Sequence, residues 1–240
     1  QSTSPVPSQM DFVEVARRFI LMPPPPSTLP YKLAKPEVKY QSQHHQDQKL
    51  EKLFAGKQNG FFIEAGAFDG EYLSNTLFLE RYQGWSGLLV EANPFDFSTM
   101  VGRGRKAWLA RVCLSSKVET ITFQALNVAG GIVNEDYIHG DKLKGGVLVN
   151  VTCVPVATLL DAIGVQHVDF WSLDIEGGEI QVLQSFPWDR FQIDLMDIEL
   201  VNQKLLSQAT EILEKAGFYL LQQNVPGDYF FAHKNAHFAS

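Results

Sequence analysis

The sequence predicts an α/β fold, in which a mostly parallel sheet carries helices on both faces. From Gly60 onward, short apolar segments of strand length alternate with segments whose apolar residues recur at helical spacing. This alternation is typical of parallel strands joined by crossover helices. The last two apolar segments flank a turn at residues 225–228, so we expect an antiparallel hairpin at one edge of the sheet.

The first half of the alternation starts with an apolar strand at residues 61–65, which ends in Gly66. Residues 72–82 carry leucines on or near one helical face and are therefore expected as a helix. The next elements, in order, are a strand at 87–91, a short helix at 95–100 and a strand at 107–114.

A two-stranded ribbon is expected to interrupt this order. Residues 118–125 alternate apolar and polar side chains, which is typical of an antiparallel strand with one solvated face. Its expected partner is the segment 147–154. A glycine-rich segment, 127–146, lies between the two, and its length fits either a lid that selects substrates or an unstructured loop.

The second half of the alternation returns to helices and strands in turn. Residues 156–163 are expected as a helix and residues 167–173 as a buried strand. The remaining elements are a helix at 178–186 ending near Pro187, a strand at 193–200, a helix at 205–216 closed by Gly217, and the hairpin strands at 218–222 and 229–233.

Residues 1–40 are predicted to form an N-terminal arm or stem outside the core, and residues 41–240 a single domain. Residues 10–22 have the spacing of a short amphipathic helix. The four prolines at 23–26 then restrict the chain to an extended polyproline II conformation. A charged and polar run with helical spacing, 41–57, opens the domain.

Composition and charge exclude several classes of protein. The chain has 240 residues, of which 45% are hydrophobic, and this excludes disorder over most of its length. Its 20 basic and 27 acidic residues give a net charge of −7, which argues against a general binder of nucleic acids or anionic membranes. The most apolar stretch, 147–165, is broken by Asn150, Pro155 and Asp161 and lacks the pattern of a membrane-spanning helix.

The sharpest motif is the segment 64–70, which reads Glu-Ala-Gly-Ala-Phe-Asp-Gly and follows the first strand. Glycines in this position let a backbone approach a ligand closely, and the N-terminus of the following helix offers free N–H groups. The alternative is a tight strand-to-helix turn that binds nothing. Glu91 ends the next strand, where Rossmann-type folds hold the hydroxyls of a ribose, and this favours a ligand.

The pattern differs from that of dinucleotide sites. The usual G-x-G-x-x-G is replaced by G-x-x-x-G, from Gly66 to Gly70, and it is led by an acid. A carboxylate at Glu64 would repel a pyrophosphate and attract a cation, such as the amino or sulfonium group of S-adenosylmethionine. A nucleotide-dependent or NAD-dependent oxidoreductase is therefore disfavoured.

A second acidic motif, with Asp174, Glu176 and Glu179, follows the strand at 167–173. Ligands of open α/β sheets bind at this carboxyl end of the strands. Asp174 or Glu176 is expected to act as general base on a hydroxyl or to bind a divalent cation. The equal alternative for each acid is capping of the next helix. Glu199 ends the next strand and is expected beside the same cleft.

With these motifs in place, residues 42–234 resemble the FkbM family of class I S-adenosylmethionine-dependent methyltransferases. Within that family, the chain is most similar to the animal branch that includes the Star protein and methyltransferase-like secretory proteins. The segments that carry the resemblance are Ser42-Gln43 with Gln46-Asp47, the motif at 62–70, the Glu-Ala-Asn-Pro run at 91–94 and the Ser-Leu-Asp-Ile-Glu-Gly run at 172–177.

The resemblance implies a Rossmann-like fold with a seven-stranded, mostly parallel sheet and a reversed terminal hairpin. It also implies S-adenosylmethionine as the cofactor, with its methionine moiety near the glycine motif, its ribose on Glu91 and its adenine near residues 113–115. The residues that it assigns to cofactor binding are Glu64, Gly66, Ala67, Asp69, Gly70, Glu91, Asn93, Leu114 and Ser115.

The activity implied by the resemblance is methyl transfer to a hydroxyl of a glycan or another small molecule. Asp174, Glu176 and Glu199 are predicted to be catalytic, and Asp174 is also a candidate ligand of a divalent cation such as Mg²⁺. The Asn/Asp-Pro-Pro-Tyr signature of amide and base methylation is absent after the fourth strand. The alternative, taken from the likeness to Star, is a catalytically inactive secretory-pathway adaptor that binds a protein cargo.

We expect the protein in the secretory pathway or outside the cell, with the cytoplasm as the alternative. The chain starts at Gln1, so we expect a processed product whose signal peptide or anchor would precede it. The triplet that starts at Asn150 is an N-glycosylation sequon. Cys113 and Cys153 lie on expected strands and either pair or remain buried thiols, of which buried thiols are the default.

Two further groups of residues are less specific. His44 and His45 precede the first strand and either fold over the pocket or lie on the surface, the second being favoured. The basic segment 102–106 is expected as solvated surface.

Overall fold

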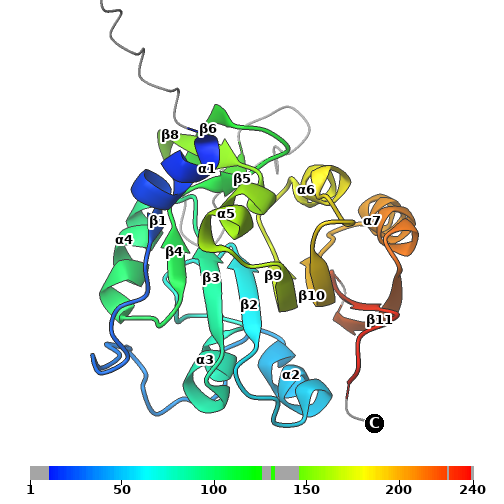
Figure 1. The fold of residues 1–240 in the computed structure, drawn as a ribbon, viewed down its shortest axis with the longest axis horizontal. Helices are drawn as coiled ribbons and strands as arrows, with labels where there is room; N and C mark the ends of the chain where they lie inside the picture. Colours follow the sequence, from blue (N-terminus) through cyan, green and yellow to red (C-terminus); the bar gives the residue numbers. More distant parts are fainter. Residues whose placement is uncertain (1–10, 126–130, 133–145, 226, 239–240) are drawn as a thin grey trace, which may run out of the picture.

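The computed structural model describes residues 11–125, 131–132, 146–225 and 227–238, and these fold around an eight-stranded sheet (Figure 1). Its strands lie in the order β1-β4-β3-β2-β9-β10-β12-β11. A smaller four-stranded sheet, in the order β5-β8-β6-β7, lies toward the top of Figure 1. The sheet is mixed and helices cover it, so the prediction of an α/β fold is confirmed.

The main sheet consists of β1 Leu21–Met22, β2 Phe61–Ala65, β3 Ser86–Val90, β4 Trp108–Ala110, β9 His167–Leu173, β10 Gln192–Glu199, β11 Phe218–Val225 and β12 Asp228–His233. The small sheet consists of β5 Cys113–Leu114, β6 Glu119–Ala125, β7 Gly131–Ile132 and β8 Val147–Val154. The helices are α1 Phe12–Val15, the π-helical η1 Ala16–Ile20, α2 Gln46–Phe54, α3 Leu77–Gln83, α4 Pro94–Arg103, α5 Val156–Ile163, α6 Glu179–Ser185 and α7 Gln203–Lys215.

The order of the parallel strands reverses between β2 and β9. From β2 the chain proceeds outward through β3 to β4, and later it returns to the other side of β2 with β9 and β10. Ligands of open α/β sheets bind at such a switch point, at the carboxyl ends of the strands. β12 lies between β10 and β11 and is antiparallel to both, which confirms the predicted hairpin.

The predicted count of seven strands is wrong by one. Strand β1 adds to the far edge of the sheet, where Leu21 pairs antiparallel with Ala110. Ala16 is 0% exposed and Leu21 6%, because both pack in the core beside α5. Part of the segment expected outside the core therefore belongs to it, while the domain boundary at residue 40 stays a prediction.

The single strand expected at 107–114 is two strands in different sheets. β4 ends at Ala110, and β5 starts at Cys113, where the chain pairs with β8. The predicted ribbon is confirmed, because β6 and β8 pair antiparallel along their length. The glycine-rich segment between them lies outside the described residues, apart from 131–132 and Gly146.

The two faces of the main sheet bury separate apolar clusters. Side chains from α5, α6 and α7 pack on one face, against strand residues such as Ile63 and Trp171. Side chains from α2, α3 and α4 pack on the other face, against Phe62 and Phe170. Helices therefore cover both faces, as predicted. No helix in the described part of the chain is long and apolar enough to cross a membrane.

Helix α3 begins five residues later than the sequence predicts. Leu73 has a φ of 61°, outside the helical range, and the helix starts at Leu77. The segment between them is held by Glu64, which accepts hydrogen bonds from Ser74, Asn75 and Thr76. A buried carboxylate therefore replaces the first helical turn with a loop beside the switch point.

Candidate functional site

A cavity of about 310 Å³ lies at the carboxyl ends of the parallel strands, at the switch point between β2 and β9. Three of the twelve predicted site residues do not line it: Asp69, Gly70 and Ser115. Those that do are Glu64, Gly66, Ala67, Glu91, Asn93, Leu114, Asp174, Glu176 and Glu199.

Gly66 brings the loop after β2 against the loop after β9. Its φ is +82°, and a Cβ on it would lie 1.7 Å from the carbonyl oxygen of Asp174. The N–H groups of Gly66 and Ala67 both donate to the carbonyl of Val90, at 3.0 Å each. This glycine is therefore required by the contact between two backbones, whatever the cavity holds.

Glu64 is buried, and its hydrogen bonds go to protein groups. One oxygen accepts from the hydroxyls of Ser74 and Thr76 at 2.9 and 2.6 Å, and the other from the Asn75 N–H at 2.6 Å. Burial raises its pKa, and the Arg105 guanidinium, 4.0 Å away, opposes that rise. Through these hydrogen bonds, the Glu64 carboxyl group holds Ser74 and Asn75 in the wall of the cavity.

Glu91 directly follows β3, and both of its carboxylate oxygens accept hydrogen bonds from backbone N–H groups. It accepts hydrogen bonds from the N–H groups of Phe68 and Asn93, at 2.8 and 2.6 Å. Burial raises its pKa to about 7. Asn93 caps helix α4 by accepting from the Phe95 N–H at 3.1 Å. Glu91 also lines the cavity.

Two residues of the glycine motif have structural roles. Asp69 accepts from the N–H groups of Glu71 and Tyr72, at 2.9 and 2.7 Å, and forms an ion pair with Arg103. A Cβ on Gly70 would lie 2.7 Å from the side chain of Met100. Both residues therefore contact helix α4, and neither lines the cavity.

Beyond β4, the cavity meets the small sheet at Leu114. The next residue, Ser115, is buried, and its hydroxyl donates to Glu119. Cys113 and Cys153 form a disulfide, with Cα atoms 4.3 Å apart, so the default of buried thiols is wrong. Their strands pair in register at this position, which brings the two residues together.

The predicted catalytic acids meet at one end of the cavity. Carboxylate oxygens of Asp174, Glu176 and Glu199 all lie within 4.8 Å of one another. Asp174 is accessible from the cavity, yet enclosure by protein and then the charges of Glu199 and Glu176 raise its pKa well above its usual range. A carboxyl group in this state holds its proton at neutral pH more strongly than an ordinary aspartate does.

Capping of the neighbouring helix falls to Glu179. Its carboxylate accepts from the N–H groups of Ile175, Gly177 and Gly178, each at 3.1 Å. The helix-capping role considered for Asp174 and Glu176 is thus performed by Glu179. This leaves the carboxyl groups of the first two beside the cavity.

Sequence reasoning missed three acids that also line the cavity: Asp96, Asp197 and Asp228. Oδ1 of Asp197 is buried without a hydrogen-bond partner among the described residues. Burial, then the charge of Asp228, raises the pKa of Asp197 well above its usual range. Asp197 precedes Glu199 by two residues on β10, so strand alternation was the signal that placed both on one face.

The ionisable residues that line this cavity are mostly acids. Eight of its lining residues are acids, and none of the described residues that line it is a lysine or an arginine. His44 lines the cavity, whereas His45 hydrogen-bonds Gln48 outside it. The expected solvated surface at 102–106 is wrong for Arg105, which is 1% exposed and pairs with Glu80 at 2.9 Å.

Residues 64–220 match the family model of the methyltransferase FkbM domain, which is more than half of the 240 residues. No curated protein matches the chain.

Among solved structures, the chain is similar to precorrin-6y C5,15-methyltransferase from Geobacter metallireducens GS-15, with 14% identity, 85% of this chain and 95% of that chain covered, and a TM-score of 0.44. A human methyltransferase 10 domain containing protein has 14% identity, covers 79% of this chain and 78% of its own, and has a TM-score of 0.44. TYW2 from M. jannaschii, solved in complex with AdoMet, is 10% identical over 84% of this chain and 78% of its own, with a TM-score of 0.35. Similarities at this level say nothing about the substrate of this chain.

Proposed function

Because the chain belongs to the FkbM methyltransferase family, we propose that it binds S-adenosylmethionine in the cavity and transfers a methyl group to a hydroxyl of a glycan or another small molecule. One observation carries this proposal. Asp174 and Glu199 bring two carboxyl groups together at the carboxyl ends of β9 and β10, beside the switch point of the sheet, where open α/β folds bind ligands.

The cofactor half of the cavity is formed by the loops after β2 and β3 and by Leu114. Glu91 would accept hydrogen bonds from the ribose hydroxyls, and the backbone of Gly66 and Ala67 would lie against the methionine moiety. Leu114 would contact the adenine. When bound, S-adenosylmethionine supplies an electrophilic methyl group.

The charge of the cavity supports a cationic cofactor. The sulfonium and amino groups of S-adenosylmethionine are both positive, and a cavity lined by acids without lysine or arginine among its described residues favours them. A pyrophosphate would face the same carboxylates at an electrostatic cost, which argues against a dinucleotide.

Asp174 is the general base in this proposal. Methyl transfer to a hydroxyl needs a group that takes the hydroxyl proton as the oxygen attacks. The enclosure of Asp174 and its neighbours Glu199 and Glu176 give it a raised proton affinity, so it competes for that proton better than an ordinary aspartate. Glu199 and Glu176 would orient the acceptor or share the proton.

A divalent cation such as Mg²⁺ is a further part of the proposal. Asp174, Glu176 and Glu199 offer oxygens close enough together to chelate one ion. Such an ion would lower the pKa of an acceptor hydroxyl. We expect EDTA to lower the methyl-transfer rate and added Mg²⁺ to restore it; an unchanged rate in EDTA contradicts a metal role.

Two features support a location in the secretory pathway. The Cys113–Cys153 disulfide is typical of oxidising compartments. Asn150, the acceptor of the sequon, is exposed, although it lies in β8 opposite Thr122. A glycan of the secretory pathway would be an acceptor that fits the proposed chemistry. Neither nucleic acid nor an anionic membrane is an expected partner.

The alternative function is a catalytically inactive adaptor of the Star type, which would use the same fold to bind a protein cargo. The two functions differ in the cavity. An adaptor has no use for a base with raised proton affinity or for a cofactor, whereas the enzyme needs both.

The test is transfer of a labelled methyl group from S-adenosylmethionine into fractionated glycans and metabolites. We expect label in one acceptor class with the wild type and at least about 100-fold less with Asp174→Asn, since a general base contributes that much or more. The matched control is Asp161→Asn, whose carboxyl group pairs with Arg190 on the surface. Equal transfer by Asp174→Asn contradicts the assignment of the base. If the folded wild type shows neither cofactor binding nor transfer into any fraction, the adaptor is favoured over the enzyme.

A further inference from the structure

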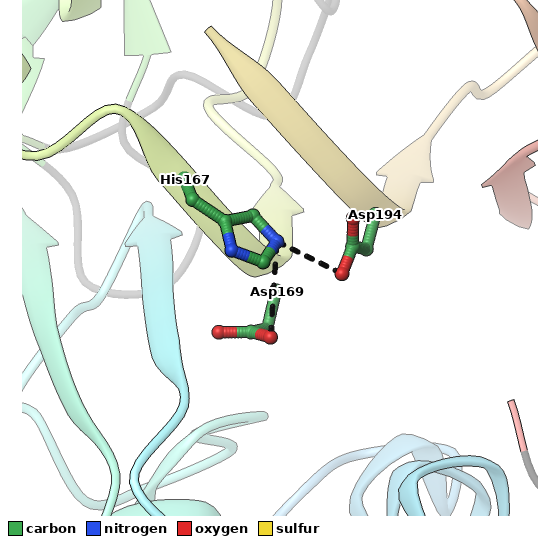
Figure 2. A group of neighbouring side chains, drawn as sticks. All are labelled: His167, Asp169 and Asp194. Carbon is green, nitrogen blue, oxygen red and sulfur yellow. Dashed lines mark hydrogen bonds and ion pairs between the residues drawn. The ribbon is translucent and has the colours of Figure 1, made fainter. Parts of the chain in front are cut away.

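A second cluster of polar side chains lies near the amino-terminal ends of β9 and β10, whereas the cavity lies at the carboxyl ends of the parallel strands. Figure 2 shows this cluster. It consists of His167 and Asp169 on β9 and Asp194 on β10. Gln192 pairs with His167 and Leu195 with Phe170, so the two aspartates fall in the same row of neighbouring strands. Five residues of strand separate Asp169 from Asp174, which is about 16 Å. This cluster is therefore independent of the proposed catalytic carboxyl groups.

Three atoms of the cluster converge on one point. His167 Nε2 lies 2.9 Å from Asp194 Oδ2 and 3.9 Å from Asp169 Oδ1, as the dashed lines in Figure 2 mark. Two ligands of a tetrahedral zinc ion, each about 2.0 Å from the metal, are about 3.3 Å apart. The observed separations lie on either side of that value, so an ion fits with small side-chain movements.

The other oxygen of each aspartate is held by a neutral donor. Asp169 Oδ2 accepts from the Phe61 N–H at 2.7 Å, and Asp194 Oδ1 accepts from the Gln192 side chain at 2.9 Å. Hydrogen bonds of this kind orient metal ligands in known sites. They leave Asp169 Oδ1 and Asp194 Oδ2 facing the common point.

The two carboxyl groups are also short of positive charge. Asp169 is 4% exposed and Asp194 7%. The Lys57 ammonium forms an ion pair with Oδ1 of Asp169 and lies 3.9 Å from Asp194 Oδ2. Two adjacent buried carboxylates thus share one ammonium and the edge of an imidazole.

Lys57 is able to leave without a change of fold. Its carbonyl accepts from the Trp85 indole at 2.8 Å, which fixes the backbone, while its side chain is 40% exposed. The His167 side chain is 45% exposed, so an ion has access from solvent. The Lys57 ammonium is thus the cation that lies against the two carboxylates, on a side chain that reaches solvent.

We propose that His167, Asp169 and Asp194 bind a divalent transition-metal ion of the zinc type, with Lys57 occupying its place in the metal-free protein. One imidazole and two carboxylates form a ligand set that suits Zn²⁺, with water as the fourth ligand. The imidazole disfavours Mg²⁺ and Ca²⁺, which prefer oxygen. The bound ion would tie β9 to β10 and, through Phe61, to β2.

The test is titration of the metal-free protein with Zn²⁺ by calorimetry and with Co²⁺ by absorption. In the Asp174→Asn variant, which lacks one ligand of the cation site proposed in the cavity, we expect one ion per chain, a cobalt spectrum of low-coordinate type and a higher melting temperature with Zn²⁺. His167→Ala is expected to weaken binding at least about tenfold. It replaces a half-exposed side chain, and Asp194→Asn, which keeps the shape of its residue, gives a second variant if the first does not fold.

Two further variants distinguish this site from the carboxyl cluster of the cavity and test the role of the lysine. Lys57→Met is expected to bind Zn²⁺ more tightly than the wild type, because no ammonium has to be displaced. Asp174→Asn, in the cavity, is expected to leave the zinc affinity unchanged. The proposal is overturned if no ion binds, if His167→Ala binds as well as the wild type, if Asp174→Asn abolishes binding, or if Lys57→Met binds more weakly.

Discussion

Gly66 and Asp174 meet backbone to backbone at the centre of the cavity wall. A Cβ on Gly66 would lie 1.7 Å from the Asp174 carbonyl oxygen, and the Asp174 N–H donates to the carbonyl of Ala65 at 3.1 Å. The loop proposed to hold the cofactor and the loop that carries the proposed base are therefore one rigid unit. A change in either is expected to reach the other.

This contact predicts the effect of Gly66→Ala. A methyl group there has to push a backbone carbonyl aside and also adopt a φ of +82°, so we expect a loss of about 3 kcal/mol or more in the free energy of unfolding. Gly164→Ala is the matched control, because its φ is +75° and nothing lies within 4 Å. It is expected to lose about 1 kcal/mol. Equal losses by the two variants in urea unfolding would show that the contact is unimportant.

The raised pKa of Glu91 predicts how stability depends on pH. Its pKa is about 7 in the folded chain and 4.5 ordinarily, so between these values the folded state binds the proton more strongly than the unfolded state. The free energy of unfolding is thus expected to fall as pH rises from 4.5 to 7, by at most about 3 kcal/mol from this residue. Glu91→Gln should remove that part of the slope, measured by urea unfolding at pH 5 and pH 8. An identical slope in the variant rules out this residue as its source.

The coupling between Asp174 and Glu199 predicts the pH profile of methyl transfer. Only the deprotonated base accepts a proton, so kcat/KM is expected to rise with pH through the raised pKa of Asp174. Glu199→Gln removes a neighbouring negative charge and should shift the profile to lower pH. A shift to higher pH, measured with the labelled cofactor, contradicts the proposed coupling.

The disulfide predicts sensitivity to reductant. Cys113 and Cys153 are 40 residues apart, and closing a loop of that length stabilises a fold by about 4 kcal/mol. Because Cys113 lines the cavity next to Leu114, reduction should also weaken cofactor binding. Both effects are checked by urea unfolding and calorimetry with and without reductant. The variant with serine at both positions serves as control and should not respond; a wild type equally indifferent to reductant would mean that the bond contributes nothing.

Local patterns in the sequence located most of the fold. The segments 156–163 and 167–173 match α5 and β9 residue for residue, because an apolar run bounded by turn residues leaves little choice of element. The predictions failed where a strand depends on pairing with a segment that is distant in the sequence. β1 forms because β4 offers an open edge, and the strand at 107–114 breaks because Cys113 pairs with β8.

The same limit applies to the site. The positions of Asp174, Glu176 and Glu199 at or just after strand ends predicted that they lie together at the carboxyl ends of the strands, and they do meet there. The sequence does not reveal that Asp69 turns toward Arg103, since the two are 34 residues apart. Nor does it reveal that Asp228 crosses from the hairpin into the cavity.

Binding of S-adenosylmethionine, measured by calorimetry, tests the central claim most directly. We predict that the cofactor or its demethylated product binds in the cavity and that Glu91→Ala weakens binding by about 1–3 kcal/mol, since a buried carboxylate that accepts hydrogen bonds from the ribose hydroxyls is lost. Glu51→Ala, which changes an acid that pairs with Lys39 on the surface, should bind as the wild type does. No detectable binding of the cofactor at millimolar concentration by the folded wild type would contradict the proposal that this chain is a methyltransferase.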